Sequence, residues 1–214
     1  MNFDELNISD DIKNAIGEMG FEKLTPIQES AIPEALEGHD LIGQAQTGSG
    51  KTIAFAVPVL EKIFIPDKSP QAIVLCPTRE LCMQVASEIE KLGSKIKKLK
   101  VLAVYGGQPI GKQTRVLKKG VHVVVGTPGR VIDHIERGNL DLIGIERVVL
   151  DELMKCWKWG SGKISKRFWP ELLIKGKPFF FQQQFLKRFA RLQKNIRRIQ
   201  NLSGYPIKSR TFQK

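Results

Sequence analysis

The chain has 214 residues, 42% of them hydrophobic, which is enough apolar material for one globular core but not for two full domains. No apolar run approaches the roughly 20 residues of a membrane span, and the start, Met1 to Glu5, lacks the pattern of a signal peptide, so we expect a cytoplasmic protein without a membrane span. The net charge is +12, but residues 1–152 hold 18 basic and 21 acidic side chains whereas residues 153–214 hold 16 and 1, so the whole basic excess lies in the last part of the chain.

Short apolar runs alternate with helical stretches over residues 1–152. Apolar residues recur at helical spacing from Ile8 to Met19, with Ser9 placed to cap the helix. Strands are expected at 40–44, 72–76, 101–105, 121–126 and 147–150, and helices at 51–63, 80–92, 113–118 and 130–138. This alternation predicts one α/β domain, a parallel sheet flanked by helices, with ligands at the carboxyl ends of its strands.

The three cysteines give no sign of a metal site. Cys76, Cys82 and Cys156 are odd in number and have no paired spacing, which favours buried, inert thiols over a disulfide framework or a zinc site.

A phosphate-binding loop is predicted between the strand at 40–44 and the next helix. Its residues are Ala45, Gln46, Thr47, Gly48, Ser49, Gly50, Lys51 and Thr52. The two glycines let backbone N–H groups turn onto phosphate oxygens, the helix start adds positive potential, and Lys51 can reach the outer phosphates. Thr52 is expected to bind magnesium. The alternative is an ordinary Gly-Ser turn, which the Gly-Lys-Thr string in this context disfavours.

A pair of acids follows the strand at 147–150. A magnesium ion held by one hydroxyl needs a carboxylate, and an attacking water needs a base. Asp151 is the candidate metal ligand and Glu152 the candidate general base. A solvated strand end is the alternative, and the pair alone does not decide between them.

Further strings complete a pattern. They are Gly20 to Gln28, Pro77 to Leu81, Gly106-Gly107 and Thr127-Pro128-Gly129-Arg130. Taken singly, Thr127 to Arg130 is more often an ordinary turn than an RNA-binding loop, and Gly106-Gly107 is first of all a loop. Together and in this order, over roughly residues 1–152, they resemble the DEAD-box RNA helicases. The resemblance implies a RecA-like P-loop NTPase domain, ATP hydrolysis with Mg²⁺, RNA as substrate and a role in RNA remodelling, ribosome assembly or decay; we expect a monomer.

The same resemblance assigns roles. Gln28 would pair with the adenine edge, with Phe21 in the same motif and Phe3 as the upstream aromatic; Leu24 stands where proline is commoner. RNA backbone contacts would come from Pro77, Thr78, Arg79, Gly106, Gly107, Thr127, Pro128, Gly129 and Arg130. Loop amides, hydroxyls and guanidinium groups can hold a sugar-phosphate chain without reading its bases.

The pattern breaks after Glu152. The family's Asp-Glu-Ala-Asp would need an alanine where Leu153 stands, and a Ser-Ala-Thr string should follow later. We hypothesise a single-base deletion. With one base restored before Leu153, shifted codons allow Ala-Asp, and Met154-Lys155 then forces Glu. The shifted frame allows Asp-Glu-Ala-Asp-Glu-Met-Leu-Glu-Met-Gly-Phe. Residues 181–184, Phe-Gln-Gln-Gln, shift to Ser or Pro, then Ala or Thr, then Ala or Thr, which allows Ser-Ala-Thr.

Two interpretations of residues 153–214 follow. We favour an out-of-frame, poorly ordered tail, because its tryptophans and phenylalanines follow no helical or strand period. The other is a basic RNA-binding extension, and residues 185–199 could form a basic amphipathic helix that binds RNA or a membrane surface loosely. In either case the second helicase domain is absent from this sequence, the first domain is incomplete, and unwinding by the chain is expected to be defective.

Two function classes remain in contention. The first is an ATPase domain with feeble turnover, because the second domain of the family supplies arginines to the γ-phosphate. The second is a non-enzymatic pseudogene product or basic RNA-sticking module. A small-molecule P-loop kinase is set aside, because its lid would have to replace the RNA motifs.

Overall fold

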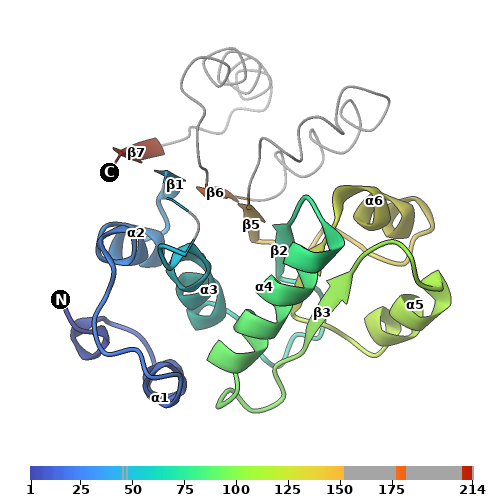
Figure 1. Cartoon of the computed structure of the whole chain (residues 1–214). Helices are drawn as coiled ribbons and strands as arrows, with labels where there is room; N and C mark the ends of the chain where they lie inside the picture. Colours follow the sequence, from blue (N-terminus) through green and yellow to red (C-terminus); the bar gives the residue numbers. More distant parts are fainter. Residues whose placement is uncertain (45, 47, 152–176, 182–208, 214) are drawn as a thin grey trace.

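The computed structural model describes residues 1–44, 46, 48–151, 177–181 and 209–213, and it shows a parallel sheet with helices packed on both faces (Figure 1). The helices are η1 (Phe3–Glu5), α1 (Asp10–Glu18), α2 (Pro26–Leu36), α3 (Lys51–Glu61), α4 (Arg79–Leu92), α5 (Ile110–Lys118) and α6 (Pro128–Glu136). The strands are β1 (Asp40–Gln44), β2 (Ala72–Leu75), β3 (Val101–Val104), β4 (Val123–Gly126), β5 (Arg147–Leu150), β6 (Lys177–Phe181) and β7 (Ser209–Gln213).

The strand order is β3-β4-β2-β5-β6-β1-β7, and every neighbouring pair is parallel. In the middle of the sheet, Ile73 of β2 is in register with Val124 of β4 on one side and Val148 of β5 on the other. Because all strands run the same way, the segments that leave their carboxyl ends gather at one edge of the sheet. The predicted α/β class is confirmed.

Two apolar clusters cover the two faces of the sheet. Successive strand residues point to opposite faces, so Val74 joins the cluster built with α1 to α4, while its neighbours Ile73 and Leu75 join the cluster that includes Val131 of α6. Strands buried on both faces explain the continuous Val and Ile runs in the sequence. In Figure 1, α1 to α3 lie toward the β1 end of the sheet and α5 and α6 toward the β3 end.

Every strand and helix expected between residues 40 and 150 is present, with small shifts at the ends. The helix after Ser9 is also present, but the Ser9 side chain does not cap it. Its hydroxyl donates instead to Glu61 Oε2 of α3 at 3.0 Å, and its backbone N–H donates to the same oxygen at 2.9 Å. Ser9 therefore ties the start of α1 to the end of α3.

Helix α2 and strands β6 and β7 were not expected. Pro33 lies inside α2 and interrupts its helical pattern, and the last part of the chain shows no strand period. A capping signal for α2 is nevertheless present, because Thr25 and Gln28 form a capping box with Pro26 at the first helical position. Among the described residues, no helix has the length and apolar character needed to cross a membrane.

Candidate functional site

The predicted site residues that the structure describes gather at the carboxyl edge of the sheet. The phosphate loop follows β1, Asp151 follows β5, Thr78 follows β2, Gly106 follows β3 and Thr127 follows β4. In the strand order, β3, β4 and β2 are adjacent, so the three segments assigned to RNA lie side by side. β1 lies beyond β5 and β6. After the ligands predicted for them, we call the β1 side of this edge the nucleotide half and the side formed by β2, β4 and β3 the RNA half; Asp151 lies between the two.

The phosphate loop has the backbone that an anion site requires. Gly48 and Gly50 have φ of +80° and +85°, a region that favours glycine. The loop closes on itself through the hydroxyl of Ser49, which donates to Gln46 O at 2.7 Å. Lys51 is the first residue of α3, so the loop ends at the positive end of a helix dipole. Ala45 and Thr47 lie outside the described residues.

Gln28 and Thr25 fasten the start of α2 to this loop. The Gln28 amide nitrogen donates to Gly50 O at 3.0 Å, and the Thr25 hydroxyl donates to Ser49 O at 2.8 Å. The Gln28 carbonyl oxygen accepts from the Thr25 N–H at 2.9 Å. A Cβ at position 50 would lie 2.3 Å from the Gln28 amide nitrogen. The φ of position 50 therefore favours glycine, and a side chain there would also displace the Gln28 amide from its contact with Gly50 O.

The buried Gln28 amide, 2% exposed, still has capacity for a ligand. A carboxamide has two N–H groups and two acceptor lone pairs, and these contacts use one of each. Adenine recognition by Gln28 stays a prediction.

The two aromatic side chains assigned to the adenine region differ in exposure. Phe3 is 3% exposed and lies in the core cluster with Leu6 and Leu24. Phe21 is 44% exposed. The Phe3 backbone N–H also donates to Glu22 O, so Phe3 supports the segment at residues 22–24. The assignment of both aromatic residues to the adenine region stays a prediction.

Asp151 ends β5 and is buried at 6% exposure, with its N–H donating to Leu75 O at 3.0 Å. One strand, β6, separates β5 from β1. At the usual strand spacing the two strand ends are roughly 10 Å apart. That span fits a phosphate chain and a hydrated cation between the loop and the carboxylate. Glu152 lies outside the described residues, so its role as base stays a prediction.

Arg79 and Gly107 meet at the ends of β2 and β3. Thr78 caps α4 by accepting from Leu81 N–H at 3.2 Å, and Arg79 is the next residue. The Arg79 guanidinium stacks over the Tyr105 ring, 5.0 Å from its centroid. A Cβ on Gly107, where φ is +85°, would lie 3.2 Å from the same guanidinium. Glycine at 107 therefore leaves room for a cation at the RNA half of the edge.

Arg130 is tied to the loop after β3. Its guanidinium donates to Gln108 O at 3.1 Å and to Gln113 Oε1 at 3.2 Å, and only 14% of the side chain is exposed. Pro128 is buried at the start of α6, whereas Thr127 and Gly129 are partly exposed. The predicted RNA residues are therefore of two kinds: Arg79 is exposed, and Arg130 is largely engaged within the protein.

Gln113 connects the elements behind this surface. Its amide nitrogen donates to Tyr105 O at 3.0 Å, while its Oε1 accepts from Arg130 and lies 2.9 Å from His134 Nε2. An acceptor oxygen at that distance requires the proton on Nε2 of the imidazole. His134 is fully buried, and this burial, followed by the Arg130 charge, lowers the pKa of His134 below its ordinary value.

Sequence reasoning missed Tyr105, Gln113 and His134. His134 carries a weak signal, because it lies four residues after Arg130 and so on the same helix face. Tyr105 directly precedes Gly106. For Gln113, a polar residue in an amphipathic helix, nothing in the sequence distinguishes a buried position from an exposed one.

Comparisons with known proteins agree with this arrangement. A family model described as DEAD/DEAH box helicase matches residues 25–179. A DEAD-box ATP-dependent RNA helicase CshA from Geobacillus kaustophilus is 53% identical over 150 residues, which are 70% of this chain and 32% of that protein. The CshA of Bacillus subtilis is 52% identical over 150 residues, 70% of this chain and 30% of the relative.

A solved structure agrees as well. The crystal structure of a DEAD box protein from Methanococcus jannaschii superposes with a TM-score of 0.86 at 39% identity, covering 99% of this chain and 55% of that one. The chain thus spans about a third of the length of these curated relatives, 32% and 30%.

Proposed function

The chain belongs to the DEAD/DEAH box helicase family, and from this premise we propose that its described domain binds ATP with magnesium at the loop of residues 45–52. The observation that carries the proposal is the loop itself, with two positive-φ glycines leading into a helix that begins at Lys51. Backbone N–H groups there can cradle phosphates, and the Lys51 ammonium adds a charge for the outer ones. The hydrogen bond from Gln28 to Gly50 O supports the proposal that this carboxamide, which lies beside the loop, pairs with the adenine edge.

Magnesium would be held by Thr52, the second residue of α3, and by Asp151 at the end of β5, partly through water. The ion would offset phosphate charge and polarise the γ-phosphoryl group. The chain's own contribution is to hold the phosphates at the helix start and to present a buried carboxylate, with one strand, β6, between its strand and the loop strand. Glu152 is proposed as the group that takes the proton of the attacking water.

We further propose that RNA lies across the ends of β2, β4 and β3. The exposed Arg79 guanidinium and the loop amides at Gly106 and Gly107 would contact the backbone, as would Thr78 and Thr127. Arg130 would act partly by holding the Gln108 loop in place. Such contacts go to phosphate and sugar, so binding would be sequence-independent and would weaken with salt.

Unwinding by these 214 residues alone is not proposed. The relatives named as RNA helicases are about three times longer than the matched region, which covers 32% and 30% of them. In the family pattern, a second RecA-like domain closes over the first and supplies arginines to the γ-phosphate, and without that stabilisation turnover falls by orders of magnitude. We propose ATP binding with very low hydrolysis, in the cytoplasm, as a monomer.

For residues 153–214 we propose that the present reading frame departs from the ancestral one near Leu153. Three features support the proposal: the loss of acids after Glu152, the codons forced by Met154-Lys155, and the string at residues 181–184, which when shifted allows Ser-Ala-Thr. Residues 177–181, the last of which begins that string, form β6 between β5 and β1. The match of the family model extends past Leu153 to residue 179. The nucleotide sequence of the gene tests the single-base deletion. We expect one reading frame near codon 153 that encodes both Asp-Glu-Ala-Asp and Ser-Ala-Thr. If no frame encodes both strings, the deletion is rejected.

The second function class, a basic RNA-sticking module without nucleotide binding, is favoured by one observation, the 16 basic residues against 1 acid after residue 152. Thermal melting separates the two classes. A cooperative melt that ATP and magnesium raise in the parent, but not in Lys51→Ala, supports the ATP-binding domain. A melt that ATP leaves unchanged, together with salt-sensitive RNA binding, supports the module.

A further inference from the structure

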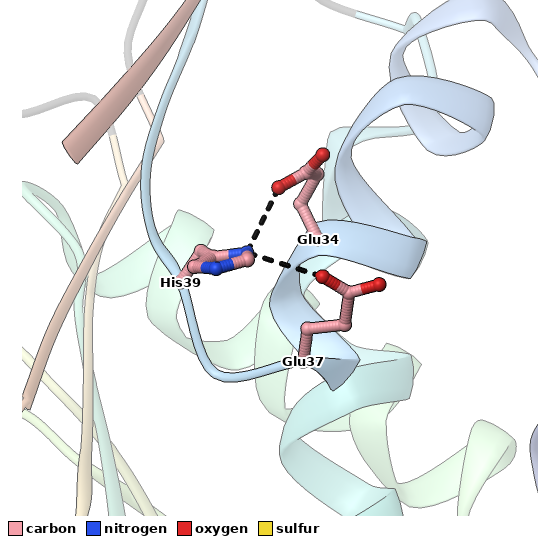
Figure 2. Close-up of side chains that lie close together, drawn as sticks. All are labelled: Glu34, Glu37 and His39. Atoms are coloured by element: carbon pink, nitrogen blue, oxygen red, sulfur yellow. Dashed lines mark ion pairs between the residues drawn. The ribbon is translucent and has the colours of Figure 1, made fainter. Parts of the chain in front are cut away.

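The end of α2 carries two carboxylates that converge with an imidazole on one point (Figure 2). His39 Nδ1 lies 2.9 Å from Glu34 Oε2 and 3.5 Å from Glu37 Oε2. One ligand atom from each residue lies within 4.8 Å of the other two. We propose that Glu34, Glu37 and His39 form a binding site for a divalent transition-metal ion, with zinc as the best-matched ion.

The distances suit a small ion with nitrogen and oxygen ligands. Zinc lies about 2.0–2.2 Å from such atoms, so two ligands of a tetrahedral ion are roughly 3.3 Å apart. The observed 2.9 and 3.5 Å lie on either side of that value, and side-chain shifts of less than about 1 Å would admit the ion. An imidazole nitrogen favours zinc and its neighbours in the first transition row over magnesium or calcium. A water molecule would complete the coordination.

The charges at this point favour a divalent cation. Glu34 and Glu37 are three residues apart on a helix, where like charges repel. Glu37 is also the C-cap residue of α2, at the negative end of the helix dipole. A protonated His39 would offset only one of the two carboxylates, and a neutral one would offset neither. A divalent ion offsets both.

Exposure indicates an exchangeable site. The Glu34 and His39 side chains are 20% and 27% exposed, and the two atoms that face each other, Glu34 Oε2 and His39 Nδ1, are shielded from solvent. Glu37 is 68% exposed, so solvent reaches the ion site from its side. Two ligands are thus partly buried and the third faces solvent. Such a site would load and release its ion without unfolding of the domain.

The ion would link two elements that flank the phosphate loop. The start of α2 holds Gly50 through Gln28, and His39 immediately precedes β1, the strand that leads into the loop. The proposed site lies at the opposite end of α2, roughly 13 Å along the helix from Gln28. Binding would therefore pin the end of α2 to the start of β1. This proposal does not depend on nucleotide binding.

The test is zinc titration of the chelator-stripped, nucleotide-free chain by calorimetry. Variants His39→Ala and Glu37→Gln each remove a ligand, and Glu136→Gln is the matched control, an exposed acid at the last residue of α6. We expect one zinc ion per chain and at least about tenfold weaker binding in both variants, since even loss of a residue that only supports a ligand commonly costs about that much. The control should bind as the parent does. Glu37→Gln changes an exposed side chain and keeps the test usable if His39→Ala does not fold.

Two spectroscopic readouts identify the ligands. In nitrogen-edited NMR spectra, zinc should shift the His39 ring nitrogens and leave those of His122 and His134 unchanged. Cobalt, used as a zinc substitute, should show no thiolate charge-transfer absorption. The proposal is overturned if the parent binds no zinc, if His39→Ala and Glu37→Gln bind zinc as tightly as the parent, or if zinc reports on another histidine or on a cysteine. None of these outcomes affects the proposed ATP site, because the assay contains neither nucleotide nor a change in the phosphate loop.

Discussion

Gln113 connects three groups inside the RNA half of the edge. Its buried carboxamide, 2% exposed, bonds to the backbone of Tyr105 and to the side chains of Arg130 and His134. Buried polar groups in a network stabilise one another when all are satisfied and are costly when one member is lost. The positions of Arg130 and of the loop after β3 therefore depend on a residue that itself touches no ligand.

Replacing Gln113 with leucine should lower the free energy of unfolding by roughly 2–3 kcal/mol, because the substitution leaves buried donors and an acceptor unpaired. Urea unfolding measures the change. Gln84→Leu is the matched control, since the Gln84 amide is exposed on α4 and donates only to Glu88. The control should change stability by less than about 0.5 kcal/mol. Equal effects of the two substitutions would show that the network contributes nothing.

His134 makes part of the stability depend on pH. Burial and the Arg130 charge lower its pKa, so in the folded state the imidazole resists a proton that the unfolded chain accepts below pH about 6.5. Above pH about 6.5, His134 is neutral in both the folded and the unfolded state. As the pH falls below that value, the free energy of unfolding decreases, by at most about 1.4 kcal/mol per pH unit from this residue.

The corresponding variant is His134→Gln, which does not titrate. Its stability at pH 7.5 should be lower than that of the parent, because it alters a packed position, but it should fall less between pH 7.5 and 5.5. Urea unfolding of the parent and the variant at the two pH values measures how far the stability of each falls. An equal or steeper fall in the variant would contradict a buried, neutral His134.

Packing of α6 onto the sheet sets a requirement at Gly126, the last residue of β4. A Cβ there would lie 2.3 Å from the Val131 side chain of α6 and 3.2 Å from Val104 O. Gly111, inside α5, is exposed and has no atom within 4 Å of the position of a Cβ. The two glycines therefore differ in what an added methyl group would meet.

Gly126→Ala should destabilise the domain by roughly 1–3 kcal/mol, because α6 must shift to admit the methyl group. Gly111→Ala should stabilise it by up to about 1 kcal/mol, because alanine is the better helix former and restricts the unfolded chain. Thermal or urea unfolding of the two variants measures the change in the free energy of unfolding, which we expect to be negative for Gly126→Ala and positive for Gly111→Ala. Changes of the same sign would contradict the close packing of Val131 against the end of β4.

The elements show what the sequence could and could not predict. Strands β2, β4 and β5 are continuous Val, Ile and Leu runs because both of their faces are buried, and that pattern is readable. Helix α2 was not predicted because Pro33 lies inside it and is unfavourable in a helix, although the capping box at Thr25 and Gln28 is a sequence signal for its start. The phosphate loop was predictable because its chemistry needs specific residues at fixed spacing. Gln113 was not, because its role depends on which residues the fold brings near it.

On the scale of the whole molecule, one edge of the sheet carries the expected chemistry in a definite order. The phosphate loop follows β1, the carboxylate follows β5, and the three RNA segments follow β2, β4 and β3. The proposed nucleotide site and the proposed RNA site therefore lie side by side on this edge, with Asp151 between them. Residues 153–214 carry 16 basic side chains against 1 acidic one, so any RNA affinity that they contribute should persist when Arg79 is replaced with alanine, which filter-binding at several salt concentrations would reveal.

The most direct test of the account is an equilibrium titration of the folded chain with a fluorescent ATP analogue and magnesium. We expect saturable binding that ATP displaces more effectively than GTP, and at least about tenfold weaker binding in Lys51→Ala, because a charge-assisted contact to phosphate is lost. A parent chain that melts cooperatively yet binds no adenine nucleotide, or a Lys51→Ala variant that binds as well as the parent, would contradict it.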